Sequence, residues 1–193
     1  MFTTLDELAA IAGTCTQCRL AESRTNVVFG MGDAHADLLF VGEGPGAEED
    51  RQGLPFVGRS GQLLDRLMAD ELGVTRAQVY VVNVVKCRPP NNRDPRPDEI
   101  AACRPYLARQ IELIKPRVVV TLGRFASQLL LDSNVPITKL RGQAYPYPYL
   151  GGEAVLIPTV HPAYALRGGT EPLALLRSDF VRAHQALAKG AAA

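Results

Sequence analysis

The sequence has no apolar run long enough to cross a membrane, only four cysteines and three histidines, and almost no net charge. A membrane-spanning helix needs about 20 consecutive apolar residues, so no membrane partner is expected. The first residues, Met-Phe-Thr-Thr-Leu-Asp-Glu-Leu, have neither a basic start nor a long apolar stretch, unlike a secretory signal. The cytoplasm is therefore the expected location of the protein.

The net charge of +1 in 193 residues does not indicate a nucleic-acid partner through bulk electrostatics. Two nucleotide-binding motifs are also absent, the GxxxxGK[ST] phosphate loop and the GxGxxG dinucleotide motif. Basic residues do gather around the third cysteine: Lys86, Arg88, Arg93 and Arg96. For each one alone a solvated surface position is the simpler interpretation, whereas together they would suit contacts with phosphates.

The composition, 47% hydrophobic and 21% charged, is typical of a soluble globular protein, and the length fits a single domain over residues 1–193. Four apolar, β-branched runs predict buried strands of a parallel sheet: Asp37–Val41, Val79–Val85, Arg117–Leu122 and Ala154–Val160. Helical spacing predicts helices at Thr4–Ala12, Ser60–Glu71, Arg96–Ile114, Arg124–Leu131 and Pro172–Ala188. This alternation predicts an α/β fold with three α/β/α layers around a central, mainly parallel four-stranded sheet.

Open α/β sheets bind ligands beyond the carboxyl ends of their strands, where this chain places glycines and polar side chains. The first predicted strand is followed by Gly42-Glu43-Gly44-Pro45-Gly46, which is either a tight turn or a loop whose backbone approaches a ligand. The acidic residues that follow this segment argue against a bound phosphate. They favour contact with a neutral base or a water molecule.

Three further side chains lie near these predicted strand ends. Phe56, between a proline and a glycine, would suit stacking on a base, although a core position explains it equally well. Asn83 interrupts an apolar strand. It is either a structural amide whose hydrogen bonds are made within the protein, or a group that recognises a ligand edge with one donor and one acceptor. His161 follows the fourth strand; a lone histidine is usually structural, but the loop expected after it raises its functional interest.

The cysteines form a CxxC pair, Cys15 and Cys18, and a distant pair, Cys87 and Cys103. In a reducing compartment this usage favours a metal site over disulfides, and the CxxC disfavours four unrelated buried cysteines. Four thiolates complete either a tetrahedral zinc site or a [4Fe–4S] site, and the spacing does not choose between them. Either group would tie the N-terminal region to the middle of the chain.

Taken together, these motifs resemble family 4 of the uracil-DNA glycosylase superfamily, the iron–sulfur-containing type. The matching segments, in order, are Cys15-x-x-Cys18, 42–46 with Glu48-Glu49-Asp50, 53–58, 83–90, Cys103 and 161–167. They extend from Cys15 to the last predicted helix, nearly the whole chain. Their order and the cysteine spacing are specific together, although no single motif is.

The resemblance implies an enzyme of base excision repair that flips uracil out of single- or double-stranded DNA. It would hydrolyse the N-glycosidic bond and leave an abasic site. The resemblance also implies a [4Fe–4S] cluster, rather than zinc, on Cys15, Cys18, Cys87 and Cys103. This cluster is expected to be structural and to present basic residues to phosphates. A monomer is expected, since nothing in the sequence indicates an obligate oligomer.

The resemblance also assigns roles to individual residues. Glu43 and His161 would be catalytic: Glu43 positions or activates water, and His161 contacts the O2 side of uracil as negative charge develops there. The implied substrate-binding residues are Gly42, Gly44, Glu49, Phe56 and Asn83. Among these, Phe56 stacks on the base, Asn83 bonds its edge, and Glu49 helps to exclude thymine. Leu166 and Arg167 would form the loop that enters the duplex.

Departures from related families narrow the expected chemistry. Family 1 enzymes carry an aspartate at the position of Gly44, whereas a glycine there is usual for family 4. Glu43 is therefore the candidate for water activation. No lysine stands out as a Schiff-base nucleophile, which predicts a monofunctional enzyme. The cross-linking relatives carry a basic insert with a histidine after the second motif; the segment Lys86–Cys103 of this chain has no histidine, so no covalent DNA adduct is expected.

Two other functions fit parts of the sequence. A non-catalytic iron–sulfur module that binds DNA and senses redox state would keep the cysteines and arginines, but would not need Phe56, Asn83 and His161 together. A zinc-containing α/β hydrolase acting on nucleotides would need a phosphate loop or catalytic metal ligands, and neither is evident. Colour separates them, because a [4Fe–4S] protein is brown and a zinc protein is colourless.

Overall fold

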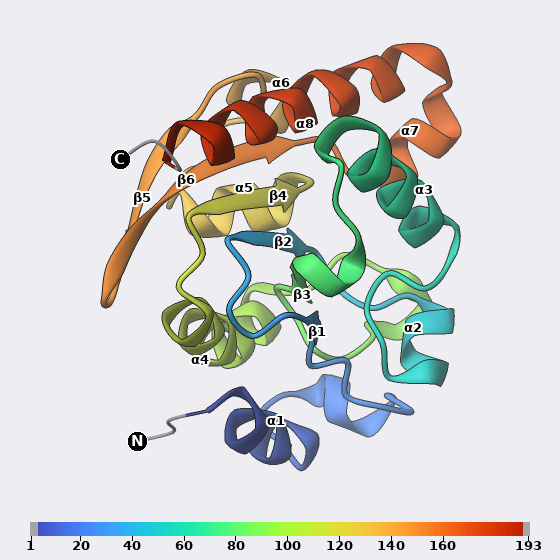
Figure 1. The fold of residues 1–193 in the computed structure, drawn as a ribbon. Helices are drawn as coiled ribbons and strands as arrows, with labels where there is room; N and C mark the ends of the chain where they lie inside the picture. Colours follow the sequence, from blue (N-terminus) through green and yellow to red (C-terminus); the bar gives the residue numbers. More distant parts are fainter. Residues whose placement is uncertain (1–3, 191–193) are drawn as a thin grey trace.

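The computed structural model describes residues 4–190 and contains a six-stranded mixed sheet (Figure 1). The strands are β1 (Met31–Gly32), β2 (Leu38–Gly42), β3 (Tyr80–Asn83), β4 (Val118–Leu122), β5 (Tyr145–Tyr149) and β6 (Gly152–Thr159). The α-helices are α1 (Leu5–Gly13), α2 (Ala47–Gln52), α3 (Arg59–Leu67), α4 (Pro97–Ile114), α5 (Arg124–Leu130), α6 (Ile137–Leu140), α7 (Pro162–Gly168) and α8 (Thr170–Gly190). Short turns of other helix types are η1 (Arg19–Glu22), η2 (Met68–Leu72), η3 (Arg76–Gln78) and η4 (Pro90–Asn92).

The centre of the sheet is formed by the four strands that the sequence predicts. The strand order is β1-β3-β2-β4-β6-β5, and the pairs β3–β2, β2–β4 and β4–β6 are parallel. Every residue of β2, β3 and β4 is buried, as strands covered on both faces require. The α/β class and the parallel core of the sheet are therefore confirmed.

The expected number of strands was wrong, because β1 and β5 add antiparallel edges to the parallel core. β1 has only two residues, too few to give a pattern in the sequence. β5 has the sequence Tyr-Pro-Tyr-Pro-Tyr, and two prolines argue against a strand. An edge position tolerates these prolines. An edge strand pairs with one neighbour only, so a proline there, which has no N–H to donate, need not leave a second strand without a hydrogen bond.

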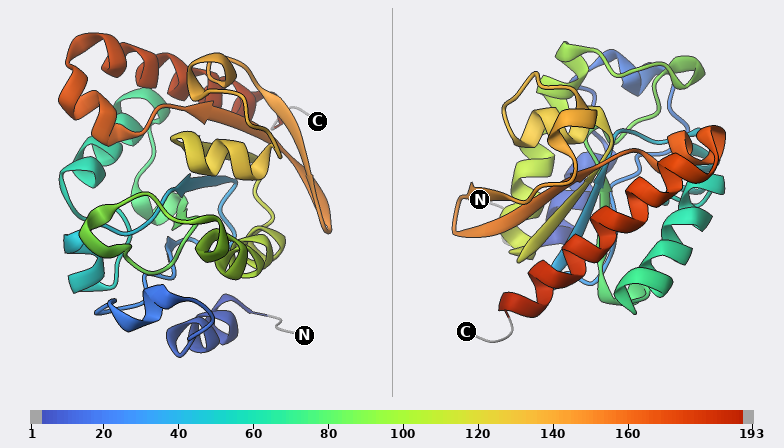
Figure 2. Two further views of the ribbon diagram at one scale, coloured as in Figure 1. Left: turned by 180° about the vertical axis from the view of Figure 1, so that it is seen from behind. Right: turned by 90° about the horizontal axis from the view of Figure 1, so that it is seen from above.

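The helices form one layer on each face of the sheet. α3, η2 and α8 bury apolar side chains against one face, where the rings of Phe40 and Phe180 stack at 5.5 Å. α4 and α5 cover the other face, and α1 packs outside α4 through Leu8, Ala12 and Tyr106. Figure 2, seen from above, shows α4 and α5 on one side of the sheet and α3 and α8 on the other. The three-layer prediction therefore agrees with the packing.

The long predicted helices are present, with ends shifted by a few residues. Thr4 caps α1: its Oγ1 accepts the amide of Glu7, and Glu7 Oε2 accepts the amide of Thr4. The predicted helix at 60–71 is α3 followed by the π-type turn η2. The short helices α2, α6 and α7 were not predicted, since four to seven residues give too little periodicity.

This topology brings four chain segments to one edge of the sheet. The parallel strands β2, β3, β4 and β6 end there, at or next to Gly42, Asn83, Gly123 and His161. Because carboxyl ends of parallel strands share one edge, residues far apart in the sequence meet there. Within residues 4–190, none of the helices combines the length and the hydropathy needed to span a bilayer.

Candidate active site

A cleft of about 590 Å³ opens at this edge of the sheet. Its lining includes Glu43 after β2, Phe56 before α3, Asn83 at the end of β3 and His161 after β6. Gly44, Glu49 and Arg167, also predicted as site residues, line the same cleft, whereas Gly42 and Leu166 do not. The fold therefore brings together most of the site residues that the sequence predicts.

Gly42 lies directly against two of the lining side chains. A Cβ atom at this position would lie 2.4 Å from Asn83 Oδ1 and 2.6 Å from the ring of Phe56. Real Cβ atoms do not approach other atoms so closely. The absence of a side chain at position 42 thus allows Phe56 and Asn83 to lie where they do.

Phe56 and Asn83 are buried at the cleft, with exposed fractions of 5% and 2%. The ring of Phe56 stacks on the His161 ring, with centroids 5.9 Å apart and planes inclined by 28°. Asn83 Oδ1 is buried and has no hydrogen-bond partner among the residues that the structure describes. Buried polar atoms are normally paired, so this oxygen fits an acceptor for a ligand donor.

His161 is held in one tautomer by the start of α7. Its Nδ1 accepts the amide of Ala163 at 3.1 Å, so the proton of a neutral ring lies on Nε2. The pKa of His161 is lowered to about 4, mainly by burial and also by the positive charge of Arg167, while Glu49 opposes the shift. At neutral pH the ring is therefore an uncharged Nε2–H donor.

Glu43 has the opposite perturbation. The pKa of this carboxyl is raised to about 7, mainly by burial and also by the negative charge of Asp94, while Arg124 opposes the rise. Asp94 and Arg124 are themselves paired, with Oδ2 and Nη2 3.0 Å apart. Glu43 is consequently the group in this cleft that changes its charge near neutral pH, as a general base does.

Glu49 contacts the backbone that follows Phe56. Its Oε1 accepts the amides of Val57 at 3.0 Å and Gly58 at 2.9 Å. The sequence did not predict this contact, because the acidic run 48–50 offers three carboxylates of equal appearance. The expected role of Glu49 in excluding thymine stays a prediction.

Leu166 and Arg167 lie on the short helix α7 and not in a loop, so the expected conformation was wrong, while their entry into the duplex stays a prediction. His161 caps this helix and Pro162 occupies its first turn, a combination that favours a helix start. Leu166 is 36% exposed beside the cleft, and Tyr164 on the same helix is more exposed. α7 thus presents an apolar surface next to the cleft.

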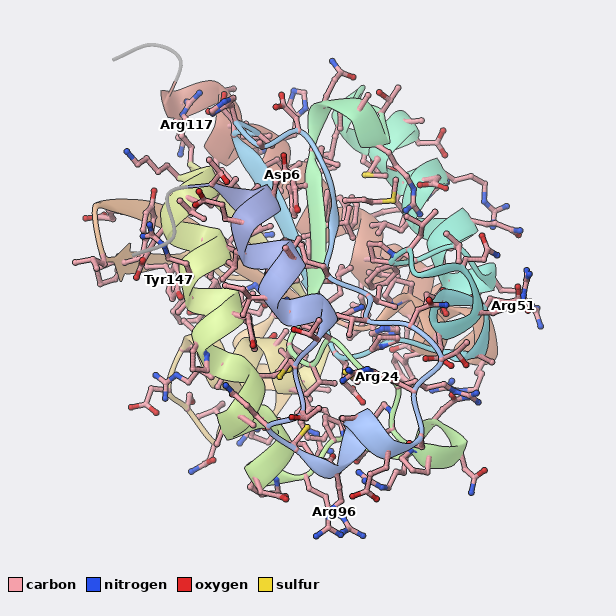
Figure 3. All side chains as sticks on the ribbon, turned by 90° about the horizontal axis from the view of Figure 1, so that it is seen from below. Asp6, Arg24, Arg51, Arg96, Arg117 and Tyr147 are labelled. Carbon is pink, nitrogen blue, oxygen red and sulfur yellow. The ribbon has the colours of Figure 1, made fainter. Side chains whose placement is uncertain are left out.

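The four cysteines line one small hollow between the N-terminal segment and α4. Two donors reach their sulfur atoms: Arg24 Nη1 lies 3.4 Å from Cys87 Sγ, and the Lys86 amide lies 3.4 Å from Cys103 Sγ. Figure 3 shows Arg24 in this region, near the yellow sulfur atoms. Four thiols that share one hollow, with a cation and an amide beside them, fit the ligand set of an iron–sulfur cluster.

The cysteine side chains do not form a metal site as they lie, since within residues 4–190 no group of three or more His, Cys, Asp or Glu side chains could hold a metal ion. Burial raises the pKa of Cys87 to about 11 and also raises that of Cys103. Positive charge from a bound group would therefore be needed to hold both as thiolates.

The predicted group of basic residues is only partly available to a partner. Lys86 is 2% exposed, and its Nζ donates to the carbonyl of Asn83 at 2.7 Å, so its assignment to phosphate contacts was wrong. Arg93 is paired with the fully buried Glu99, with Nη2 and Oε1 2.5 Å apart. Arg96 is exposed and points to solvent in Figure 3. Lys86 lies in the bend that follows β3, where its side chain is buried beside Cys87 and Cys103.

Fold and cleft define an α/β protein with a cleft at the carboxyl ends of its parallel strands and a separate hollow lined by four cysteines. The chain belongs to the uracil-DNA glycosylase superfamily, whose family model matches residues 29–187. Three similar proteins carry the name type-4 uracil-DNA glycosylase. The protein from Thermotoga maritima is 53% identical over 82% of this chain and 81% of its own length. The Sulfurisphaera tokodaii protein is 49% identical over 79% of this chain and 71% of its own length. The Saccharolobus solfataricus protein is 45% identical over 95% of this chain and 86% of its own length. Within the superfamily, the chain belongs to this type-4 group.

Proposed function

We propose that this protein removes uracil from DNA by hydrolysing the N-glycosidic bond, leaving an abasic site for base excision repair. The observation that carries the proposal is the cleft, in which Phe56, Asn83, His161 and Glu43 meet from four separate segments. The type-4 relatives are named as uracil-DNA glycosylases, which supports the same chemistry. A module that only bound DNA would not need this set of side chains.

Uracil recognition rests on stacking and on one edge of the base. Stacking on Phe56 would contribute roughly 1–3 kcal/mol, as base–aromatic contacts do elsewhere. The unpaired Oδ1 of Asn83 would accept the N3–H of uracil, while its amide nitrogen would donate to O4. Gly42 supports this recognition indirectly, because a Cβ there would displace Phe56 and Asn83, and Gly44 likewise packs closely, since a Cβ there would lie 2.8 Å from Val85.

Bond cleavage places negative charge on the leaving uracil and positive charge on the sugar. His161 would donate its Nε2–H to O2 as that charge develops, and one such donor contributes about 2.7–4 kcal/mol to transition-state stabilisation. Its neutral state suits the role, because the Nδ1 bond to Ala163 keeps the proton on Nε2. Glu43 would orient the attacking water and accept its proton.

Access to the bond requires that the nucleotide leave the base stack, at a cost of a few kcal/mol that is lowest in weak pairs and single strands. The exposed Leu166 on α7 would enter the space that the base vacates, and Arg167 would contact the backbone nearby. We therefore propose both single- and double-stranded uracil-containing DNA as substrates. One chain supplies every residue used here, which supports action as a monomer, and we place this single-domain repair protein in the cytoplasm.

We also propose that Cys15, Cys18, Cys87 and Cys103 hold a [4Fe–4S] cluster. Such a cluster would supply a covalent link between the N-terminal segment and the segment 88–102, without acting on the base. The segment 88–102 contributes Asn92, Arg93 and Asp94 to the cleft, so its position matters for the site. Iron and sulfide analysis of brown purified protein would support this cofactor. Colourless protein with stoichiometric zinc would contradict it.

The proposed activity is tested with labelled oligonucleotides that carry one uracil or, as the control, one thymine at the same position. Strand cleavage at uracil only after alkali is expected, because a monofunctional enzyme leaves an intact abasic site. Folded, brown protein that leaves both oligonucleotides intact would favour the non-catalytic DNA-binding module. Cleavage without alkali would contradict the monofunctional assignment.

A further inference from the structure

Phe56 has a backbone conformation that a non-glycine residue seldom adopts. Its φ angle is +53°, in the left-handed region, and its ring is almost fully buried at the cleft. Such a conformation persists only when surrounding contacts determine it. The segment 55–58 therefore depends on groups that hold its backbone in place.

Arg76 holds the carbonyl groups of this segment. Its Nη1 donates to the Pro55 carbonyl at 2.9 Å, and its Nη2 donates to the Phe56 carbonyl. Its Nε donates to Asp65 Oδ1 at 2.5 Å, which fixes the plane of the guanidinium. A planar guanidinium with donors in a fixed fork can satisfy three acceptors at once, which an ammonium cannot do in the same geometry.

Two other contacts surround the same segment. Glu49 accepts hydrogen bonds from the backbone amides of Val57 and Gly58. The carboxylate of Glu49 thus bonds the amides of this segment, and the guanidinium of Arg76 bonds its carbonyl groups. The backbone of α3 lies close as well, since a Cβ on Gly61 would lie 1.7 Å from the Phe56 carbonyl oxygen. With Gly61 packed on one side, Arg76 is the side chain that reaches both carbonyls.

Arg76 also connects the segment 55–58 to the strand that carries Asn83. It begins the turn η3 (Arg76–Gln78), which leads directly into β3 (Tyr80–Asn83). The stacking surface and the edge-recognising amide are thus joined through one side chain. A shift of about 1 Å in such a positioned group can reduce a reaction rate on the order of 100-fold.

We propose that Arg76, oriented by Asp65, is a positioning residue that fixes the Phe56 ring for stacking on the flipped base. This inference rests on the proposed function, since it assigns a purpose to the Phe56 ring. Arg76 touches neither the base nor the sugar in this assignment. Its effect passes through Phe56, and that separates it from a residue that merely stabilises the fold.

The test is a double-mutant cycle in the full-length protein, with wild type, Arg76→Ala, Phe56→Ala and the double variant in single-turnover excision assays. Arg76→Ala is expected to lower the rate roughly 10- to 100-fold in the wild-type background. In the Phe56→Ala background it should lower the rate less than about threefold, because the ring it positions is absent. Equal losses in both backgrounds, or no loss in either, would overturn the proposal.

Ligand binding supplies a second measurement, which distinguishes a residue that positions Phe56 from one that only stabilises the fold. Arg76→Ala should weaken inhibition by free uracil, which stacks on Phe56. It should leave affinity for DNA with a tetrahydrofuran abasic analogue unchanged, because that DNA has no base to stack. Equal weakening of both would mean a general loss of structure and would overturn the proposal.

Arg117→Ala is the matched control. Arg117 also pairs with an aspartate, at 3.2 Å from Asp37, and donates to a backbone carbonyl, that of Leu187, at 2.9 Å. Arg117 does not line the cleft, and Figure 3 shows it at the opposite end of the molecule from Arg96. This variant should keep wild-type excision and uracil inhibition; losses equal to those of Arg76→Ala would overturn the proposal.

If Arg76→Ala does not fold, Arg76→Lys and Asp65→Asn replace it in the cycle. Lysine keeps the charge but cannot reach both carbonyls in the same plane, and asparagine loosens the guanidinium without removing it. Each should give an intermediate loss that disappears in the Phe56→Ala background. Wild-type protein without uracil excision would refute the proposed function, whereas active wild type with fully active Arg76 and Asp65 variants would refute only the role of Arg76.

Discussion

The charge state of Glu43 should set the pH dependence of excision. Its pKa is raised to about 7, whereas that of His161 is lowered to about 4, so Glu43 is the group of this pair that titrates between pH 5.5 and 8.5. If the ionised carboxylate accepts a proton from water, the rate follows the ionised fraction. That fraction rises from about 10% at pH 6 to about 90% at pH 8, so the rate should rise about tenfold.

Single-turnover excision with excess enzyme at constant ionic strength isolates this effect, because DNA affinity depends strongly on salt. Glu43→Gln should remove the pH-dependent rise and lower the rate at pH 8 on the order of 100- to 10,000-fold, the range of general base catalysis. The glutamine variant keeps nearly the same size and polarity. A profile with the same midpoint in Glu43→Gln would refute the assignment of Glu43 as the base.

The neighbours of Glu43 predict the direction in which the midpoint moves. Asp94→Asn removes a negative charge that raises the pKa of Glu43, so the midpoint should fall. Arg124→Ala removes a positive charge that lowers that pKa, so the midpoint should rise. Opposite shifts from the two partners of one ion pair cannot come from a general loss of stability. Shifts in the same direction would contradict the electrostatic explanation.

The remaining predictions concern the pocket, the donor and the cysteine site. Gly42→Ala should abolish uracil binding, measured by calorimetry, because the new Cβ would lie 2.4 Å from Asn83 Oδ1. The circular dichroism spectrum of this variant should be retained. The control Gly13→Ala, a position with open space around it, should bind uracil normally. His161→Asn, which keeps an N-cap for α7, should lower the excision rate about 100- to 1,000-fold without changing abasic-DNA affinity, and near-normal turnover would remove His161 from the mechanism. Cys87→Ala should lose visible absorbance and iron and should melt at a lower temperature; a folded variant with unchanged DNA affinity and activity would contradict a structural cluster.

The sequence predicted the parallel core of the sheet because its strands are buried on both faces and leave a continuous apolar pattern. It did not predict β5, whose alternating tyrosines and prolines form a strand only because a single neighbour, β6, pairs with it. It also did not predict α7, a helix of only seven residues that begins at Pro162 and is capped by His161. Edge strands and short helices depend on tertiary contacts that a local pattern does not contain.

The site shows the same division. Asn83 and His161 stood out because a polar residue in or directly after an apolar strand is unusual. Arg76 did not, since its partners Pro55 and Phe56 lie 20 or more positions away and nothing around it marks it as special. Lys86 gave a misleading signal, because its charge suggested a phosphate contact, while in the bend after β3 its side chain is buried and its Nζ donates to the Asn83 carbonyl.

The central claim is that uracil binds in the cleft between Phe56, Asn83 and His161. A crystal structure of the wild-type protein soaked with free uracil tests it most directly. The account predicts the ring stacked on Phe56, its N3–O4 edge on the Asn83 amide and its O2 within hydrogen-bond distance of His161 Nε2. Uracil bound elsewhere, or bound in this cleft without contact to Asn83, would contradict the account.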